Sequence, residues 1–234
     1  MTVAPAPDVD DLESYRRELT AYCYRMLGSG FDSEDAVQDT LVRAWKAADG
    51  FEGRSSVRSW LYRIATNVCL DMLRGQQRRA RPVELGPAMP PTESSLAGLL
   101  PDDSWVSPIA DERVLPLEAD PAEFAEVRES VRLAFVSALQ QLPPKQRAVL
   151  ILCEVLRWQA TEVAALLDTT VASVNSALQR ARATLATNDG AVPVPIPSDA
   201  RELLDRYVDA FERYDVDELV TLLHFDAVQS MPPF

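Results

Sequence analysis

The chain has 234 residues, of which 47% are hydrophobic, and a formal net charge of −13 at pH 7. This length and hydrophobic content predict two or three small domains, each with a buried core. No stretch is apolar enough to span a membrane, and the start, MTVAPAPDVDD, lacks the basic and apolar parts of a signal peptide, so we expect a cytoplasmic protein.

The negative charge is unevenly distributed along the chain. Residues 12–81 and 131–187 each have a net charge of +3, whereas residues 82–130 have −9, residues 188–234 have −7 and residues 1–11 have −3. Two weakly basic segments are therefore separated by acidic ones. This pattern is compatible with a polyanion that contacts the basic segments alone.

Three isolated cysteines, Cys23, Cys69 and Cys153, each lie in an apolar helical pattern. We expect them to be reduced core residues and not disulfide partners or metal ligands. His224 is the one histidine of the chain, so we expect no zinc site, and no cofactor is predicted.

The first basic segment predicts three helices, at 12–27, 33–48 and 54–74. The turn GSGFDS ends the first, and Asp32 or Ser33 is expected to cap the second. The inner face of the second helix is predicted to contain Val37, Leu41, Ala44, Trp45 and Ala48. Its outward side chains, for which solubility is an equally good explanation, are Asp35, Gln38, Asp39, Arg43 and Lys46.

The third helix has two distinct faces. Its predicted core positions recur at helical spacing and are Val57, Leu61, Ile64, Ala65, Val68 and Met72. Its polar stripe is Arg63, Asn67, Asp71, Arg74 and Arg78. Because this stripe is mostly arginine with an amide in the middle, it can lie on a phosphate backbone and offer a base-reading group.

Residues 81–121 lack periodicity and contain eight of the 17 prolines of the chain, which predicts an extended linker. Within it, LAGLLPDDSWVSPI mixes acids with the apolar residues Leu99, Leu100, Trp105 and Ile109. A solvated tether and a docked segment are both compatible with this pattern.

Helices are predicted to resume near Pro121 and to run to about Leu142. Farther on, a helix-turn-helix pattern places small Ala164 at the helix crossing, Asp168 in the turn and Thr170 as the cap of the second helix. The side chains Val174, Leu178, Ala181 and Leu185 are expected to hold that helix on its partner. Its outward residues are Ser173, Asn175, Ser176, Gln179, Arg180 and Arg182, a set that favours DNA contact over an exposed structural helix.

After Asn188, the proline-rich spacer VPVPIP precedes an acidic tail. Leu203, Leu204, Tyr207, Val208 and Phe211 predict an amphipathic helix. A second short helix is expected at 216–223, and a strand at 227–231. This tail is interpreted either as a docking segment or as the front end of a further domain.

Two stretches resemble a known family, the extracytoplasmic-function (ECF) sigma factors. DSEDAVQDTLVRAWKA with FEGRSSVRSWLYRIATNVCLDMLR resembles their second conserved region, and LPPKQRAVLILCEVLRWQATEVAALLDTTVASVNSALQRARATL resembles their fourth. The tail resembles the start of a SnoaL-like domain, an α+β fold. The implied fold is mainly α, with a disordered N-terminus (1–11), a region 2 domain (12–81), an acidic linker (82–120), a region 4 domain (121–187), a spacer (188–198) and a partial SnoaL-like segment (199–234).

The resemblance implies a promoter-recognition subunit of RNA polymerase. Its second helix would bind the clamp coiled coil of the largest polymerase subunit through Asp35, Gln38, Asp39 and Arg43. The minus-ten element would be contacted by Phe51, Arg54, Arg58, Arg63, Asn67 and Arg74, with Asn67 and the loop 49–54 capturing a flipped non-template base. Trp60 is compatible with a core role or a wedge role.

The outward face of the helix-turn-helix would read the duplex minus-thirty-five element, and its domain would contact the flap of the second-largest subunit. Many family members have Lys and Arg where this chain has Asn175 and Ala177, which implies a different sequence preference. The tail is expected to regulate activity in cis. One other function remains as the alternative, a helix-turn-helix regulator independent of polymerase. An enzyme of the SnoaL-like type is not expected, because it would rest on the tail alone and no acid-base pair is apparent.

Overall fold

The computed structural model describes residues 7–53, 55–74, 105–116, 127–188 and 198–222. These residues are mainly helical and contain no β-strand, as the predicted mainly α fold requires. Pro121 and the strand expected at 227–231 lie outside these residues. In chain order the helices are α1 (Val9–Glu13), α2 (Arg16–Leu27), α3 (Gly30–Ala47), η1 (Ala48–Gly50), α4 (Val57–Met72), η5 (Asp111–Arg113), α6 (Leu133–Gln140), α7 (Pro144–Leu150), the π-helical turn η6 (Ile151–Val155), α8 (Ala160–Leu166), α9 (Val171–Asn188), α10 (Ser198–Glu212) and α11 (Val216–Leu222).

The first module consists of α1 to α4, with α2, α3 and α4 packed against one another. The helix expected at 12–27 is divided, because α1 ends at Glu13 and α2 begins at Arg16. Gly28 ends α2 in a left-handed conformation with φ 72°, which glycine adopts without steric cost.

The cap predicted for the second helix was wrong, because α3 begins earlier than expected. Ser29 has an extended backbone, and its hydroxyl accepts a hydrogen bond from the Asp32 amide at 3.2 Å. The hydroxyl of Ser33 instead lies inside the helix and donates to the Ser29 carbonyl. Gly30, the second glycine of GSGFDS, is thus the first residue of α3 and does not belong to a longer turn.

The predicted core position of Trp45 was also wrong, since its side chain is 61% exposed. Val37, Leu41, Ala44 and Ala48 are buried as expected. These four residues follow one another at spacings of four, three and four, which fills one narrow stripe of the helix. Trp45 lies one residue beyond Ala44 and is therefore rotated by about 100° out of that stripe.

The helix expected at 54–74 begins at Val57, where the hydroxyl of Ser56 accepts a hydrogen bond from the Ser59 amide at 3.1 Å. Leu61, Ala65 and Val68 are buried in the core, as predicted. Val57, Ile64 and Met72 are half-buried and pack against its edge.

Residues 105–116 of the linker are docked onto the first module. Val106, Val114 and Leu115 are buried with Ala21 and Tyr24 of α2 in a second hydrophobic cluster. Backbone and side-chain hydrogen bonds fix this contact, because the Ser107 amide donates to the Gly28 carbonyl at 3.0 Å and the Tyr24 hydroxyl donates to the Ser107 carbonyl at 2.9 Å. For this stretch the docked interpretation is confirmed, whereas Leu99 and Leu100 lie outside the described residues.

The second module consists of α6 to α9, and its first helix is shorter than expected. Residues 127–130 are helical, but a turn at Val131 and Arg132 separates them from α6. Arg132 has φ −61° and ψ 140°, an extended conformation that interrupts the helical hydrogen bonds.

The helix-turn-helix details are confirmed in α8 and α9. Asp168 has φ 50°, and the Thr170 hydroxyl accepts a hydrogen bond from the Ser173 amide at 3.1 Å. Val174 and Ala181 are buried against the rest of the module, and Leu178 and Leu185 are half-buried.

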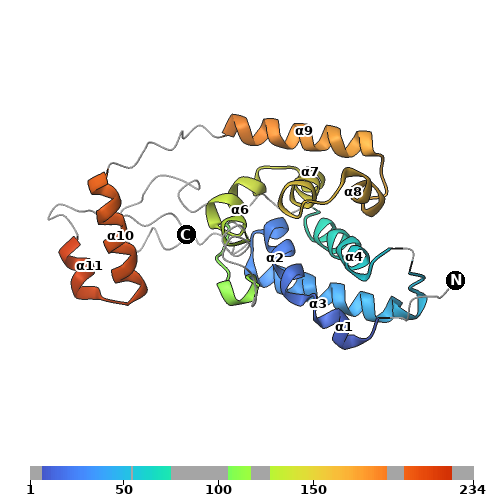
Figure 1. The fold of residues 1–234 in the computed structure, drawn as a ribbon, viewed down its shortest axis with the longest axis horizontal. Coiled ribbons are helices and arrows are strands. Elements are labelled where there is room, and N and C mark those ends of the chain that lie inside the picture. The colour runs from blue at the N-terminus through green and yellow to red at the C-terminus, as the bar shows by residue number, and fades with distance from the viewer. Residues whose placement is uncertain (1–6, 54, 75–104, 117–126, 189–197, 223–234) are drawn as a thin grey trace, which may run out of the picture.

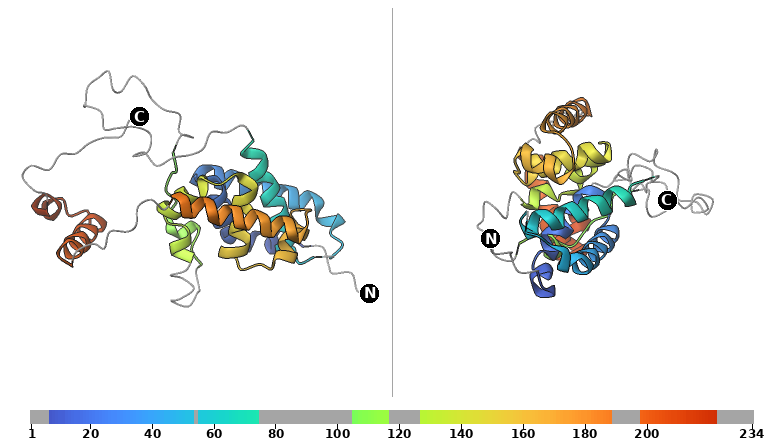
Figure 2. Two further views of the ribbon diagram at one scale, coloured as in Figure 1. Left: turned by 90° about the horizontal axis from the view of Figure 1, so that it is seen from above. Right: turned by 90° about the vertical axis from the view of Figure 1, so that its right-hand side faces the viewer.

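The two modules pack directly on each other and share one continuous hydrophobic core. Figure 1 shows α7 and α8 lying between α9 on one side and the helices of the first module on the other, and the views of Figure 2 agree. Arg147 of α7 is only 4% exposed at this junction. Its guanidinium donates to the carbonyl of Met26 at the end of α2, and to the carbonyls of Gln140 and Leu142 at 3.1 Å each.

The tail helices α10 and α11 pack against each other and stand apart from the two modules (Figures 1 and 2). Ala210 is buried between them, and Arg206 forms an ion pair with Glu218 at 2.6 Å. The apolar side chains predicted for α10 are largely exposed, from 44% for Tyr207 to 59% for Phe211. This hairpin therefore presents an apolar face that the described residues leave uncovered.

The cysteines are free thiols: Cys23 and Cys69 are buried, as expected, and Cys153 is half-buried. Among the residues that the structure describes, no group of His, Cys, Asp and Glu side chains is arranged to hold a metal ion. No helix in the described ranges has the length and apolar character needed to cross a membrane.

We predict that Arg147→Met lowers the free energy of unfolding by about 2–4 kcal/mol, because it leaves several buried carbonyl groups without a donor. Urea denaturation monitored by circular dichroism measures this change. Arg132→Met is the matched control, since Arg132 is 66% exposed and pairs with its neighbour Glu129. The control should change stability by less than about 0.5 kcal/mol. Equal losses in the two variants would contradict the assigned role of Arg147.

Candidate nucleic-acid interface

The polar stripe predicted on α4 is exposed along its described length. Arg63, Asn67, Asp71 and Arg74 are all exposed, whereas Arg78 lies outside the described residues. Arg74 forms an ion pair with Asp71 at 3.2 Å, one turn beyond Asn67. The amide of Asn67 therefore stands between two guanidinium groups on an open helix face.

A short loop precedes α4 and supports the end of the stripe. The ring of Phe51 packs on the ring of Trp60 with centroids 5.1 Å apart, and both side chains are half-buried. Gly53 has φ 67°, a left-handed conformation that lets the chain turn sharply before the helix. Arg54 lies outside the described residues. The contact of Trp60 with Phe51 ties the loop to α4.

Two arginines of the predicted minus-ten set face the second module. The guanidinium of Arg58 is 3.1 Å from a carboxylate oxygen of Glu18 and lies over the rings of Tyr62 and Trp158, 5.4 and 5.5 Å from their centroids. Arg63 donates from Nη2 to the carbonyl of Ala165 in α8 at 2.8 Å. The structure therefore does not present all six predicted residues on one open surface.

Trp158 is a residue of this interface that the sequence pattern did not single out. Its ring packs on Tyr62 of α4 with centroids 5.1 Å apart. It lies in the loop between η6 and α8, where no helical periodicity applies. A composition signal was nevertheless present, since a tryptophan in a polar loop is unusual unless its ring is buried against another element.

The outward face of α9 is arranged as predicted for a recognition helix. All six predicted residues are exposed, namely Ser173, Asn175, Ser176, Gln179, Arg180 and Arg182. Arg182 forms an ion pair with Glu154 of η6, which leaves Asn175, Gln179 and Arg180 as the outward groups able to bond bidentately to base edges. Ala177 is 9% exposed and packs inward, so it contributes no polar group to this face.

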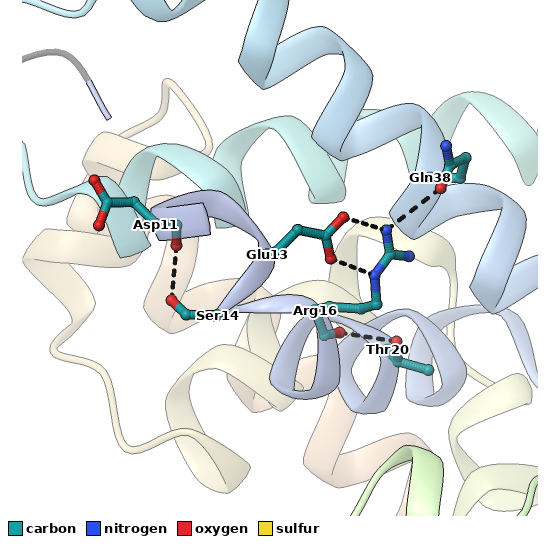
Figure 3. A network of polar contacts seen from close by, with 6 residues as sticks. All are labelled: Asp11, Glu13, Ser14, Arg16, Thr20 and Gln38. Carbon is teal, nitrogen blue, oxygen red and sulfur yellow. Dashed lines mark hydrogen bonds and ion pairs between the residues drawn. The ribbon is translucent and has the colours of Figure 1, made fainter. Parts of the chain in front are cut away.

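The four residues predicted to bind polymerase lie together on α3. Asp35, Gln38 and Arg43 are exposed, and Asp39 is half-buried and pairs with Arg43 at 2.8 Å. Figure 3 shows how Arg16 of α2 connects this face to α1 by bonding Glu13 at 2.6 Å and Gln38 at 3.4 Å. The Arg16 guanidinium holds the pKa of Glu13 below its usual value, because it donates a hydrogen bond to the charged Glu13 carboxylate.

Two exposed aromatic residues extend this face beyond the predicted set. Phe31 is 85% exposed and Trp45 is 61% exposed. With Asp35, Gln38 and Val42 between them, they follow spacings of four and three residues, which is the repeat of a helix that packs along another helix. Counting this repeat in the sequence could have found them.

Comparison with known protein families matches two parts of the chain. Residues 12–79 match "Sigma-70 region 2" and residues 132–185 match "Sigma-70, region 4". The chain is 50% identical over 227 residues to the ECF RNA polymerase sigma factor SigG of Mycobacterium tuberculosis, covering 95% of this chain and 60% of that protein. It is 30% identical over 168 residues to the ECF RNA polymerase sigma-E factor of Salmonella typhimurium, covering 72% of this chain and 78% of that protein.

Solved structures show the same fold. CnrH in complex with the cytosolic domain of CnrY matches with a TM-score of 0.50 at 24% identity, over 79% of this chain and 88% of that chain. The extracytoplasmic-function sigma factor SigJ of Mycobacterium tuberculosis matches with a TM-score of 0.50 at 22% identity, over 96% of this chain and 69% of that chain.

The chain spans about 60% of the length of SigG, the relative with 50% identity. Its identity to the Salmonella sigma-E factor nevertheless extends over most of that protein. With both sigma-70 regions present in order, the chain belongs to the ECF family of RNA polymerase sigma factors.

Proposed function

We propose that this protein is a sigma factor that binds core RNA polymerase, recognises minus-ten and minus-thirty-five promoter elements, and promotes DNA melting. The observation that carries the proposal is the presence, in one chain of this family, of two separate exposed polar helix faces, on α4 and on α9. Each face combines arginine with an amide, the pairing that suits phosphate and base contacts.

In this proposal, the face of α4 acts on melted DNA. Asn67 offers both a donor and an acceptor to the edge of a base, and Arg63 and Arg74 on either side offer charge to phosphates. Extruding a base costs a few kcal/mol, so a protein that holds the extruded base stabilises the open duplex. Phe51, Arg54 and Arg58 complete the proposed minus-ten set.

Arg58 and Arg63 contact the second module, and this contact competes with their proposed binding to melted DNA. Arg63 donates to the Ala165 carbonyl and Arg58 lies over the ring of Trp158, so the second module engages both guanidinium groups. In the proposed mechanism the two modules therefore separate before these arginines contact DNA. Asn67 and Arg74 need no such change, because they are already exposed.

The face of α9 is proposed to read the duplex minus-thirty-five element in the major groove, and the face of α3 to bind the clamp coiled coil of the largest polymerase subunit. The heptad-like stripe that includes Phe31 and Trp45 supports the second assignment, because it matches the repeat by which a helix packs on a coiled coil. The flap of the second-largest subunit is the proposed partner of the second module.

The alternative, a helix-turn-helix regulator independent of polymerase, makes a different prediction in an electrophoretic shift assay with duplex promoter DNA. A sigma factor should shift the promoter only when core polymerase is added. Tight binding by the protein alone, unchanged by core polymerase, would overturn the proposed function. Run-off transcription over a randomised promoter library then identifies the preferred elements.

We expect Asn67→Ala to lower open-complex formation on the promoters of this factor by about tenfold, the cost of one lost base contact of roughly 1–3 kcal/mol. Permanganate footprinting measures the opening. Binding to core polymerase, measured by pull-down, should be unchanged. An equal loss in both assays would remove the base-reading role.

The converse variant replaces Asp39 and Arg43 together with alanine. It should weaken binding to core polymerase by several-fold, measured as competition against another sigma factor. The fold should tolerate the change, because these side chains are 45% and 49% exposed and their pair contributes only about 0.3–0.5 kcal/mol. Unchanged competition would argue against the clamp assignment.

The tail is proposed to be the start of a SnoaL-like extension that regulates the sigma factor in cis. The uncovered apolar face of α10 supports this, because such a face normally packs on further elements of a domain. Deletion after Asn188 should change transcript yield in a reconstituted assay without changing the thermal stability of the two modules. An unchanged yield would show that the tail is passive.

A further inference from the structure

A cavity of about 510 Å³ lies where α2, α4, the docked linker residues and the second module meet. Four arginines line it: Arg17 and Arg25 of α2, Arg58 of α4, and Arg157, which follows η6. Glu18 is the one carboxylate of the described lining. A volume of this size is typical of small-molecule sites, and so high a proportion of cationic groups is unexpected in a chain with a net charge of −13.

Arg25 is a buried arginine of this lining whose hydrogen-bond partners among the described residues are neutral. Its side chain is buried, with 2% of the residue exposed, and its donors are directed to one serine: Nη2 to the Ser130 hydroxyl at 2.6 Å and Nε to the Ser130 carbonyl at 3.3 Å. No carboxylate among the described residues forms an ion pair with it. Burial lowers the pKa of Arg25 to about 10, because the charged form is poorly solvated there. A buried guanidinium with only neutral partners lacks the counter-charge that normally offsets its desolvation.

Arg17 lines the same cavity and also has a neutral hydrogen-bond acceptor. Its Nη1 donates to the Leu115 carbonyl at 2.9 Å, which again is a neutral group. Glu18 does not supply the missing charge, because Arg58 already binds both of its carboxylate oxygens at 3.1 and 3.2 Å. An arginine has five N–H donors, so Arg17 and Arg25 can each donate further hydrogen bonds into the cavity.

We propose that this cavity binds a small anion with two or more phosphate charges, the chemistry that inorganic pyrophosphate and the phosphate chain of a nucleotide share. Arginine guanidinium groups pair bidentately with phosphate oxygens, and the convergence of several arginines favours a multiply charged ligand over a single one. The half-buried Tyr15 in the same wall offers an aromatic surface to a nucleobase. Because both modules and the linker line the cavity, the bound anion stabilises their packed arrangement.

Isothermal titration calorimetry of the full chain with orthophosphate, pyrophosphate and ATP, at constant ionic strength set with KCl, tests the proposal. Pyrophosphate should bind at least about tenfold more tightly than orthophosphate, as expected for added charge-assisted hydrogen bonds. ATP binding more tightly than pyrophosphate would assign the site to a nucleotide, and equal affinities would assign it to the phosphates alone. No binding of any of the three at millimolar concentration would overturn the proposal.

Variants locate the binding in the cavity. Because Arg25 is buried, its substitution risks unfolding the protein, so Arg17→Gln, a change at a half-buried position, carries the test. It should weaken pyrophosphate binding by about tenfold. Arg132→Gln removes the same charge from an exposed side chain outside the lining and should leave the affinity unchanged. Equal affinities for the Arg17→Gln and unaltered proteins, or an equal loss in the Arg132→Gln control, would place the anion elsewhere and overturn the proposal.

Discussion

The buried guanidinium of Arg147 is the contact on which the joint arrangement of the two modules depends. It donates to the carbonyls that end α2 and α6, groups that have no partner within their own helices. A positive charge is also favoured at helix C-termini, where the helix dipole is negative. One side chain of α7 therefore completes two helix ends in different modules, and the apolar residues around it merge into one core.

That arrangement divides the polar groups of α4 into two sets. Arg58 and Arg63 are used to hold the second module, whereas Asn67 and Arg74 face solvent. A cation–π contact contributes about 0.5–2 kcal/mol and a charged hydrogen bond about 1.5–3 kcal/mol. The polar part of the contact is thus worth a few kcal/mol, and the shared hydrophobic core adds to it. Separation of the modules therefore requires a partner that binds the separated arrangement more tightly than the packed one.

Local signals predicted much of the fold and of the candidate site. The left-handed turn at Asp168, the Thr170 cap and the exposed stripe of α4 each depend on residues a few positions apart, which is the range that helical periodicity and capping rules describe. Trp45 was placed in the core on its spacing, but the adjacent Ala44 already occupies the buried stripe and Trp45 is rotated out of it. The contacts of Arg63 with α8 and of Arg58 with Trp158 join residues about a hundred positions apart, so no local pattern could have revealed them.

The docked linker residues show how an acidic segment can be held on a weakly basic module without depending on charge. Val106, Val114 and Leu115 are buried, and each such side chain contributes about 1.5–3 kcal/mol. The ion pair of Arg113 with Glu34 is exposed, and pairs of that kind contribute at most about 1 kcal/mol. Apolar burial therefore dominates this contact, and salt has little effect on it. Phosphate contacts by α4 and α9 are instead weakened steeply by salt, so ionic strength acts on the proposed DNA interface while the linker stays docked.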